Sequence, residues 1–310
     1  MYLGGRYVKP FLSVYGHVSI DQIITVDEFP RPNTSVDALE KELRLGGIST
    51  NISVRASSMK VPTAACSFVG SDFPKDFEKF MKDSGVIMNE FVKIDGHYTS
   101  TALIVNNSKM DQTVCFLQGA QGCASSHGIE LIKNAEKSDA VHFSTGDPDY
   151  YIGLMKKLSG KTKITFDPAQ EIRDKWINGR FQTALELSDR FFCNEHEAKA
   201  AMDYLKIDSL SKIKKELVVC TRGSKGSEAY FDGKKVDIPA IKSKKVVDPT
   251  GAGDAFRAGF YSGIFHKCSI DESLIIASAA ASFAVEAVGS LSNIPSWDEV
   301  LERADRELTR

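Results

Sequence analysis

The sequence has few of the patterns that mark metal-binding, secreted or membrane proteins. Its six cysteines form no CxxC pair, and its six histidines form no HxxxH or HExxH pattern, so a zinc protease is not indicated. Most cysteines stand in apolar runs, which favours reduced thiols in a core over a disulfide framework or a zinc site. No apolar run approaches the ~18 residues of a membrane span, and Met1–Lys9 lacks the pattern of a signal peptide. We therefore expect a cytoplasmic protein that does not bind a membrane.

Charge and nucleotide-binding patterns argue against further classes of protein. The chain has 39 Lys and Arg against 41 Asp and Glu, a net charge of −2, and so lacks the basic surface that nucleic-acid binding needs. No G-x-G-x-x-G follows an early strand, which argues against a dinucleotide-dependent oxidoreductase. Ser159–Thr162 (SGKT) resembles the end of a P-loop, but Met155 stands where the first glycine belongs. The expected order of helix, loop and strand is also the reverse of a P-loop.

Apolar periodicity indicates an α/β fold. With 310 residues, 42% of them hydrophobic, the chain can bury a large core. Short β-like runs alternate with amphipathic stretches, as in the helix Ile48–Met59 and the strand Thr63–Val69. Two long helices, Gly253–Phe265 and Asp271–Ala287, are expected near the C-terminus. The alternation predicts a mostly parallel sheet with helices on both faces, in a single domain over residues 1–310.

One stretch departs from this alternation. Glu90–Ile94, Thr101–Val105 and Thr113–Leu117 are expected as strands with no helix between them. Such a group predicts an antiparallel excursion from the α/β body. We expect a small β-sheet built from segments near 36–45 and 90–117.

The segment that most suggests chemistry is Asp248–Phe256 (DPTGAGDAF). We expect a loop that opens a helix, with Gly251 and Gly253 allowing close backbone approach. The free amides of Gly251, Ala252, Gly253 and Asp254 would form an anion site at the positive end of the helix, suited to a phosphoryl group in transfer. Asp254 lies in the first turn, where its carboxylate can accept a proton from a nearby hydroxyl. From these residues alone, an aspartate cap with glycines for a tight turn is an equal explanation.

Three other places are compatible with ligand binding, each with a plainer alternative. Asp21 follows the expected strand Phe11–Val18, where open α/β sheets bind ligands, or it is a turn residue. Asn194 and Glu197 share a helix face and offer oxygen ligands suited to magnesium, or they form a solvated helix start. The glycines of Thr221–Gly226 (TRGSKG) would let a base or a phosphate approach the backbone, or they form a hairpin turn.

Together these segments resemble the ribokinase-like (PfkB) carbohydrate and nucleoside kinases. DPTGAGDAF resembles the second signature of that family and GGISTN resembles the first, and the match covers nearly the whole chain. The resemblance implies a three-layer αβα ribokinase-like fold with a small β-sheet lid, and the use of ATP and Mg²⁺. It implies that Ala277–Gly289 lines the nucleotide site. It assigns substrate binding to Asp21, Gly46, Gly47 and Asn51, and phosphoryl transfer to Gly251, Ala252, Gly253 and Asp254. It assigns ATP binding to Asn194, Thr221, Gly223, Lys225 and Gly226. It places Mg²⁺, bound through water, at Asn194 and Glu197, and a K⁺ site at Asp248 and Thr250.

The acceptor that the resemblance implies is a nucleoside. FPRPNTS (Phe29–Ser35), STGDP (Ser144–Pro148) and FDPAQE (Phe166–Glu171) are more similar to the archaeal nucleoside kinases than to ribokinases. The acceptor would be the 5′-hydroxyl of an inosine, guanosine, cytidine or adenosine type nucleoside. A sugar or polyol kinase of the ribokinase, phosphofructokinase or myo-inositol kinase type is the alternative. Phe116 and Gln170 are candidates for the base pocket, although we expect core packing for Phe116 and a loop position is an alternative for Gln170.

The resemblance also implies a mechanism and an assembly. The substrate hydroxyl would face Asp254, ATP would lie over Thr221–Gly226, and the lid would exclude water. Lids of this family often pair, which implies a homodimer. An inactive kinase-like binding protein is the remaining alternative, but Asp254 and the glycines before it are present.

Overall fold

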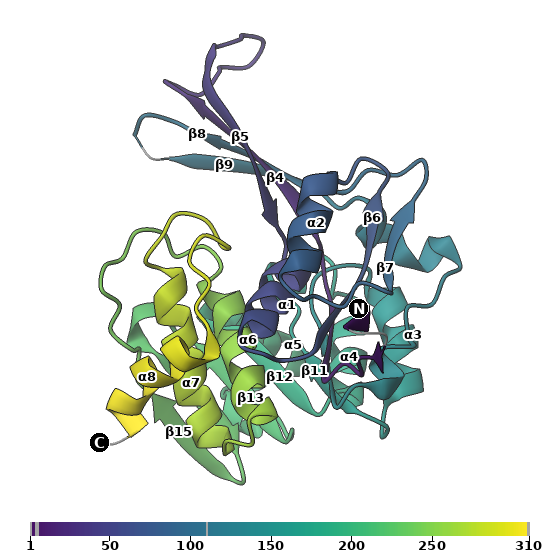
Figure 1. Cartoon of the computed structure of the whole chain (residues 1–310), viewed down its shortest axis with the longest axis vertical. Coiled ribbons are helices and arrows are strands. Elements are labelled where there is room, and N and C mark those ends of the chain that lie inside the picture. The colour runs from purple at the N-terminus through teal and green to yellow at the C-terminus, as the bar shows by residue number, and fades with distance from the viewer. Residues whose placement is uncertain (1, 4–5, 110, 309–310) are drawn as a thin grey trace.

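The body of the protein is built on a large twisted sheet (Figure 1). The computed structural model describes residues 2–3, 6–109 and 111–308. The strands of this sheet are, from one edge to the other, β15 (Lys234–Ile238), β14 (Ser227–Phe231), β13 (Leu217–Thr221), β12 (Arg190–Asn194), β11 (Lys163–Phe166), β10 (Ala140–Phe143), β3 (Leu12–Tyr15), β6 (Thr63–Gly70) and β7 (Phe91–Ile94). The strands from β13 to β7 are parallel, and β14 and β15 add an antiparallel hairpin. A separate pair is formed by β1 (Tyr2–Leu3) and β2 (Arg6–Tyr7).

Helices cover both faces of the large sheet because its strands are apolar on both sides. In β12, Phe191 and Cys193 belong to the core on one face, and Phe192 belongs to the core on the other. The first face carries α3 (Pro148–Leu158), α4 (Arg180–Leu187) and α5 (Glu195–Leu205). The second face carries α1 (Ile48–Ser58), α2 (Lys75–Asp83), α6 (Ala252–Phe265), α7 (Ile270–Ala284) and α8 (Trp297–Leu308). Short 3-10 turns lie at η1 (Ala120–His127), η2 (Ala135–Lys137), η3 (Ala169–Arg173), η4 (Leu210–Lys212) and η5 (Gly223–Lys225).

A smaller four-stranded sheet projects from the body as an arm (Figure 1). Its order is β5 (Ala38–Gly46), β4 (Ser19–Val26), β8 (Ser100–Asn106) and β9 (Gln112–Leu117). β4 pairs in parallel with β8, while the two outer pairings are antiparallel. Leu39, Leu43, Val114 and Phe116 are exposed on its strands. The smaller sheet therefore keeps apolar side chains at its surface.

The predicted α/β class and the mostly parallel sheet are confirmed, with three local corrections. The first strand ends at Tyr15, and a second strand, β4, begins at Ser19. The strand expected at Glu90–Ile94 pairs in parallel with β6 and so belongs to the large sheet. The helix expected to run to Ala287 ends at Ala284. In the described ranges no helix combines the length and apolarity needed to cross a bilayer.

Candidate active site

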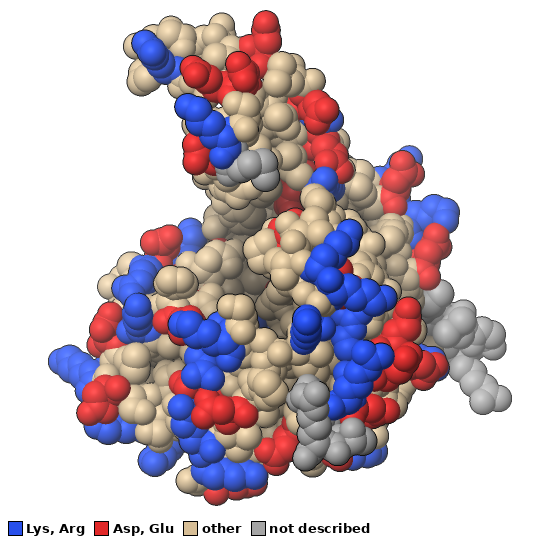
Figure 2. All heavy atoms as spheres, turned by 90° about the vertical axis from the view of Figure 1, so that its left-hand side faces the viewer, with Lys and Arg blue, Asp and Glu red and all other residues tan. Residues whose placement is uncertain are grey.

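A cavity of about 820 Å³ lies where the smaller sheet meets the carboxyl ends of the parallel strands. Figure 2 shows the surface hollowed beneath the projecting arm. Thr145, Asp167, Asn194 and Thr221 reach the cavity from the ends of β10, β11, β12 and β13. Ligands of open α/β sheets bind at this edge of the sheet. The cavity brings together these predicted residues: Asp21, Gly47, Asn51, Gln170, Asn194, Glu197, Thr221, Gly223, Lys225, Thr250, Gly251, Ala252, Gly253 and Asp254.

The positive end of α6 opens into this cavity. Gly251 precedes the helix with a φ of 77°, a left-handed conformation that favours glycine. A Cβ on Gly251 would lie 2.6 Å from the Cβ of Ser290, so the loop also needs glycine for space. No side chain caps this end of α6 in the described part of the chain, which leaves its dipole available to an anion. The amide of Ala252 is an exception to our expectation, because it donates to the carbonyl of Pro249 at 3.1 Å.

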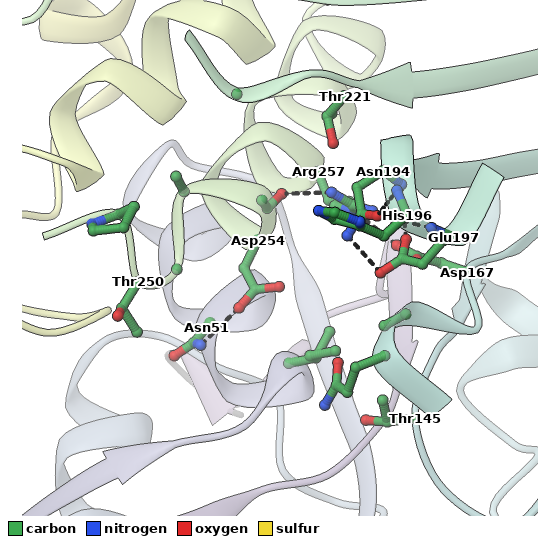
Figure 3. A pocket seen from close by; sticks show the side chains of 18 of the residues that line it. Asn51, Thr145, Asp167, Asn194, His196, Glu197, Thr221, Thr250, Asp254 and Arg257 are labelled. Atoms are coloured by element: carbon green, nitrogen blue, oxygen red, sulfur yellow. Dashed lines mark hydrogen bonds and ion pairs between the residues drawn. The ribbon is translucent and has the colours of Figure 1, made fainter. Parts of the chain in front are cut away.

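Asp254 lies in the first turn of α6 and is held by Asn51 of α1 (Figure 3). Asn51 Nδ2 donates to Asp254 Oδ2 at 2.7 Å, and Ser290 Oγ donates to Asn51 Oδ1 at 2.9 Å. Burial raises the pKa of Asp254 above its ordinary value, and the hydrogen bond from Asn51 opposes this shift. A carboxylate with a raised pKa is a stronger base than a free aspartate.

Asp21 lies on β4 at the base of the smaller sheet rather than after the first strand. Ser19 Oγ donates to Asp21 Oδ1 at 2.7 Å, and burial raises the pKa of Asp21. A Cβ on Gly46 would lie 2.3 Å from Asp21 Oδ2, and one on Gly47 would lie 2.3 Å from the carbonyl of His17. Gly46 therefore makes room for the Asp21 carboxylate without itself lining the cavity.

Asn194 and Glu197 form a capping box at the start of α5. The amide Nδ2 of Asn194 donates to Glu197 Oε1 and its backbone amide donates to Oε2, both at 2.7 Å. Burial and the nearby Asp167 raise the pKa of Glu197 to about 7, against the opposing charge of Arg257. The hydrogen bonds of Asn194 and Glu197 are therefore those of a helix start, as the plainer alternative predicted. Both residues nevertheless line the cavity.

The sequence reasoning missed a buried charge network next to this capping box (Figure 3). Arg257 Nε donates to Asp167 Oδ2 at 2.6 Å, and Arg257 Nη1 donates to the carbonyl of Gly253 at 3.2 Å. Burial alone would raise the pKa of Asp167, but Arg257 and His142 outweigh it and lower the pKa to about 2. Arg257 directly follows the signature DPTGAGDAF, so its position beside the site could have been noticed in the sequence.

A second cavity of about 580 Å³ adjoins the first and is more apolar. Ile241, Val246, Phe256 and Val285 line it, and Thr221, Gly223, Ser224 and Gly253 belong to both cavities. The predicted residue Gly226 lies in this cavity rather than in the first. Small side chains of α7 form one wall, namely Ser278, Ala281 and Ser282.

The remaining predicted residues fall at the edges of the site. Phe116 is 41% exposed, so the expectation of core packing is wrong. It lines the first cavity and packs edge-on against His17, with 5.1 Å between ring centroids. Asp248 lies outside this cavity, and its carboxylate accepts from the amides of Thr250 and Gly289 at 2.9 and 2.8 Å.

An open helix N-terminus with an adjoining carboxylate, beside an apolar cavity of nucleotide size, is an arrangement suited to a phosphotransferase. The chain matches the model of the pfkB family carbohydrate kinases over residues 9–297 and belongs to that family. The nucleoside kinase of Methanocaldococcus jannaschii is 33% identical over 98% of this chain and 99% of that protein. The nucleoside kinase of Methanothermobacter thermautotrophicus is 33% identical over 94% of each chain.

The crystal structure of the Methanocaldococcus jannaschii nucleoside kinase has the same architecture. Its TM-score to this chain is 0.88 at 31% identity, over 97% of this chain and all of that one. The predicted ribokinase-like fold and the family resemblance are therefore confirmed.

Proposed function

We propose that this protein is an ATP-dependent kinase that phosphorylates the 5′-hydroxyl of a nucleoside. The observation that carries the proposal is the position of Asp254, partly buried at the open N-terminus of α6 and lining the larger cavity. The names of the relatives from two archaea support a nucleoside as the acceptor.

The two adjoining cavities suit the two substrates. The apolar cavity offers Ile241, Phe256 and Val285 to the adenine of ATP, because a base needs an apolar wall. Among the residues that line both cavities, Thr221, Gly223 and Ser224 lie where the phosphates would pass toward α6. The larger cavity then holds the acceptor, with Asp21, Gly47 and Asn51 on the ribose side.

Phe116, His17 and Gln170 supply the base side of the acceptor site. Phe116 offers an aromatic face beside the cavity. His17 is buried, and burial lowers its pKa to about 4, so its ring is neutral at physiological pH. Its Nε2 has no hydrogen-bond partner among the described residues. A neutral imidazole and an amide suit the polar edge of a nucleobase.

The donor set at the end of β11 and the start of α5 fits Mg²⁺. Asp167 Oδ1 is buried and has no hydrogen-bond partner within the described ranges, and Glu197 lies beside it in the cavity lining. Oxygen ligands and retained water are what Mg²⁺ prefers. Both oxygens of Glu197 already accept from Asn194, so the pair would hold the ion through water. When bound, the ion neutralises charge on the phosphates.

The transfer is an in-line displacement at the terminal phosphorus of ATP. The 5′-oxygen forms the new P–O bond, the bond to the bridging oxygen of ADP breaks, and the hydroxyl proton passes to the Asp254 carboxylate. The open end of α6 stabilises the charge that develops on the phosphoryl oxygens. Arg257 holds the Gly253 carbonyl and so positions this turn.

The smaller sheet is proposed as the lid of a single kinase domain over residues 1–310. It lies against the cavity through Asp21, Ala102, Val114 and Phe116, and closing it would exclude water from the transfer. Exposed apolar residues of the same sheet, such as Leu39 and Leu43, support pairing of two lids in a homodimer. A K⁺ site at Asp248 and Thr250 stays a prediction from the resemblance.

An acceptor panel tests the proposal. We would measure phosphate transfer from ATP–Mg²⁺ to inosine, guanosine, adenosine and cytidine beside ribose, fructose 6-phosphate and myo-inositol. Transfer to nucleosides is the expected result. Transfer to free sugars or polyols alone would refute the nucleoside assignment and keep the phosphotransferase. No transfer to any acceptor, with ATP still bound, would refute the proposed function.

A further inference from the structure

A cluster of nitrogen and sulfur ligands lies at the base of the smaller sheet, outside the cavity described above. His97 precedes β8, and Cys123 and His127 lie on η1, which follows β9. One ligand atom from each of the three side chains lies within 4.8 Å of the other two, and each side chain is partly exposed. We propose that His97, Cys123 and His127 bind a divalent ion of the zinc class and brace the base of the β8–β9 hairpin.

The spacing of the three ligands is close to that of a metal site. Cys123 Sγ lies 3.9 Å from His127 Nε2. Bonds of about 2.3 Å to sulfur and about 2.0–2.1 Å to nitrogen place tetrahedral ligand atoms about 3.3–3.6 Å apart. The ligand atoms therefore need to approach one another by at most about 1.5 Å, which rotation of these partly exposed side chains can supply. Two imidazoles and one thiolate favour Zn²⁺, Co²⁺ or Ni²⁺ over Mg²⁺.

The surrounding contacts hold the rings in place, and a metal ion would take over the ligand atoms of Cys123 and His127 from them. The two imidazoles meet edge to face with 4.9 Å between centroids, and Phe68 packs against His127 at 5.0 Å. His127 Nε2 lies 2.8 Å from the carbonyl of Ala120, and Cys123 Sγ lies 3.6 Å from it. Binding would exchange these contacts for metal bonds, with the thiol proton released to solvent. Water would complete the tetrahedron.

The site joins two segments that both lead into the smaller sheet. The amide of Ala120 donates to the carbonyl of Tyr98 at 2.9 Å, so the two segments are already adjacent. A metal bond across them would stabilise the fold against opening of the hairpin base. The spacing patterns of the sequence could not reveal it, because His97 is 26 residues from Cys123.

Cobalt spectroscopy tests this site independently of the proposed kinase activity. Reduced, metal-free protein would be titrated with Co²⁺ and then with Zn²⁺. We expect visible bands and a near-ultraviolet thiolate-to-cobalt band that saturate at one ion per chain and disappear when Zn²⁺ is added. Cys123→Ser should lose the thiolate band, and His97→Ala and His127→Ala should weaken binding at least about tenfold.

Two cysteine variants serve as matched controls. Cys268→Ser removes another partly exposed thiol, and Cys115→Ser removes the exposed thiol of β9; both should retain the spectrum and the stoichiometry. Zn²⁺ should raise the melting temperature of the wild type and of both controls, but not of Cys123→Ser. A spectrum unchanged in Cys123→Ser, or no thiolate band at one equivalent of Co²⁺, would overturn the proposal.

Discussion

Asn51 Nδ2 donates a 2.7 Å hydrogen bond to Asp254 Oδ2, and so joins α1 to the first turn of α6 across 203 positions of sequence. Ser290 Oγ donates a hydrogen bond to Asn51 Oδ1 and so fixes the orientation of the Asn51 amide. Of the two carboxylate oxygens of Asp254, the hydrogen bond engages Oδ2, which leaves Oδ1 for an incoming hydroxyl. The pair connects the first family signature to the second.

Removing this hydrogen bond should affect turnover more than ATP binding. In Asn51→Ala, Asp254 loses its orienting donor, and a lost hydrogen bond to a partly buried charged group costs about 1–3 kcal/mol. We expect kcat to fall about tenfold to a hundredfold, with the KM for ATP nearly unchanged. Steady-state kinetics with both substrates varied would check this. Ser290→Ala, which removes only the outer contact, should show a smaller effect.

Replacing Asp21 should weaken binding of the nucleoside acceptor much more than binding of ATP. Its carboxylate lies at the base of the smaller sheet, with Ser19 donating to one oxygen. In Asp21→Ala the vicinal hydroxyls lose an acceptor, so the KM for the nucleoside should rise at least about tenfold while that for ATP stays within about twofold. Steady-state kinetics with each substrate varied in turn would measure both KM values, and isothermal titration would check the binding of each ligand. Equal weakening of both ligands would contradict the assignment.

The raised pKa of Glu197 predicts a pH dependence of stability. A glutamate in an unfolded chain has a pKa near ~4.3, whereas burial raises that of Glu197 to about 7. The fold therefore favours the protonated form, and this contribution is present below the unfolded pKa and is lost as pH rises through about 7. Urea unfolding should show a fall in stability between about pH 5 and pH 8 that Glu197→Gln reduces.

The same titration should govern Mg²⁺ binding. Because the carboxylate must be ionised to hold the ion, the apparent affinity for Mg²⁺ should rise with pH through about 7. In Glu197→Gln no proton competes with the ion at this side chain. The Mg²⁺ affinity of this variant should therefore be weaker than that of the wild type and independent of pH over this range. An affinity independent of pH in the wild type would argue against a role of Glu197 at the metal.

Breaking the Asp167–Arg257 pair should destabilise the fold strongly. Arg257→Met leaves the buried Asp167 carboxylate without its partner, and loss of one member of such a pair costs about 3–5 kcal/mol. The double variant Asp167→Leu with Arg257→Met should be more stable than Arg257→Met alone. Urea denaturation of the wild type, Asp167→Leu, Arg257→Met and the double variant would measure the coupling. Additive losses would show that the pair does not interact as the 2.6 Å contact implies.

The fold could be predicted where local signals were strong. Periodicity located most helices and strands, and the glycines of DPTGAGDAF located the open end of α6. The boundary between β3 and β4 was missed because the alternating apolar pattern of Leu12 and Val14 resumes at Val18 and Ile20, although the two strands belong to different sheets. β7 was assigned to the smaller sheet because sequence spacing does not show which sheet a short strand joins.

The site could be predicted only where the residues belonged to a motif. Asp254, Asn51 and Asp21 were found in this way, and the cavity contains all three. Asp167 and Arg257 were missed because their roles come from a contact across 90 positions. Phe116 was assigned to the core because an aromatic residue in an apolar strand is usually buried, whereas β9 lies at the edge of the projecting sheet.

The most direct test of the account is Asp254→Asn, assayed for ATP-dependent phosphorylation of a nucleoside and for binding of both substrates. Asparagine keeps an acceptor for Asn51, and it removes a partly buried carboxylate whose pKa is raised, so at neutral pH the variant should be at least as stable as the wild type. We predict both ligands bound with wild-type affinity and kcat lowered about 10²–10⁴-fold. Near-normal turnover in the folded variant would contradict the role of Asp254 as the base.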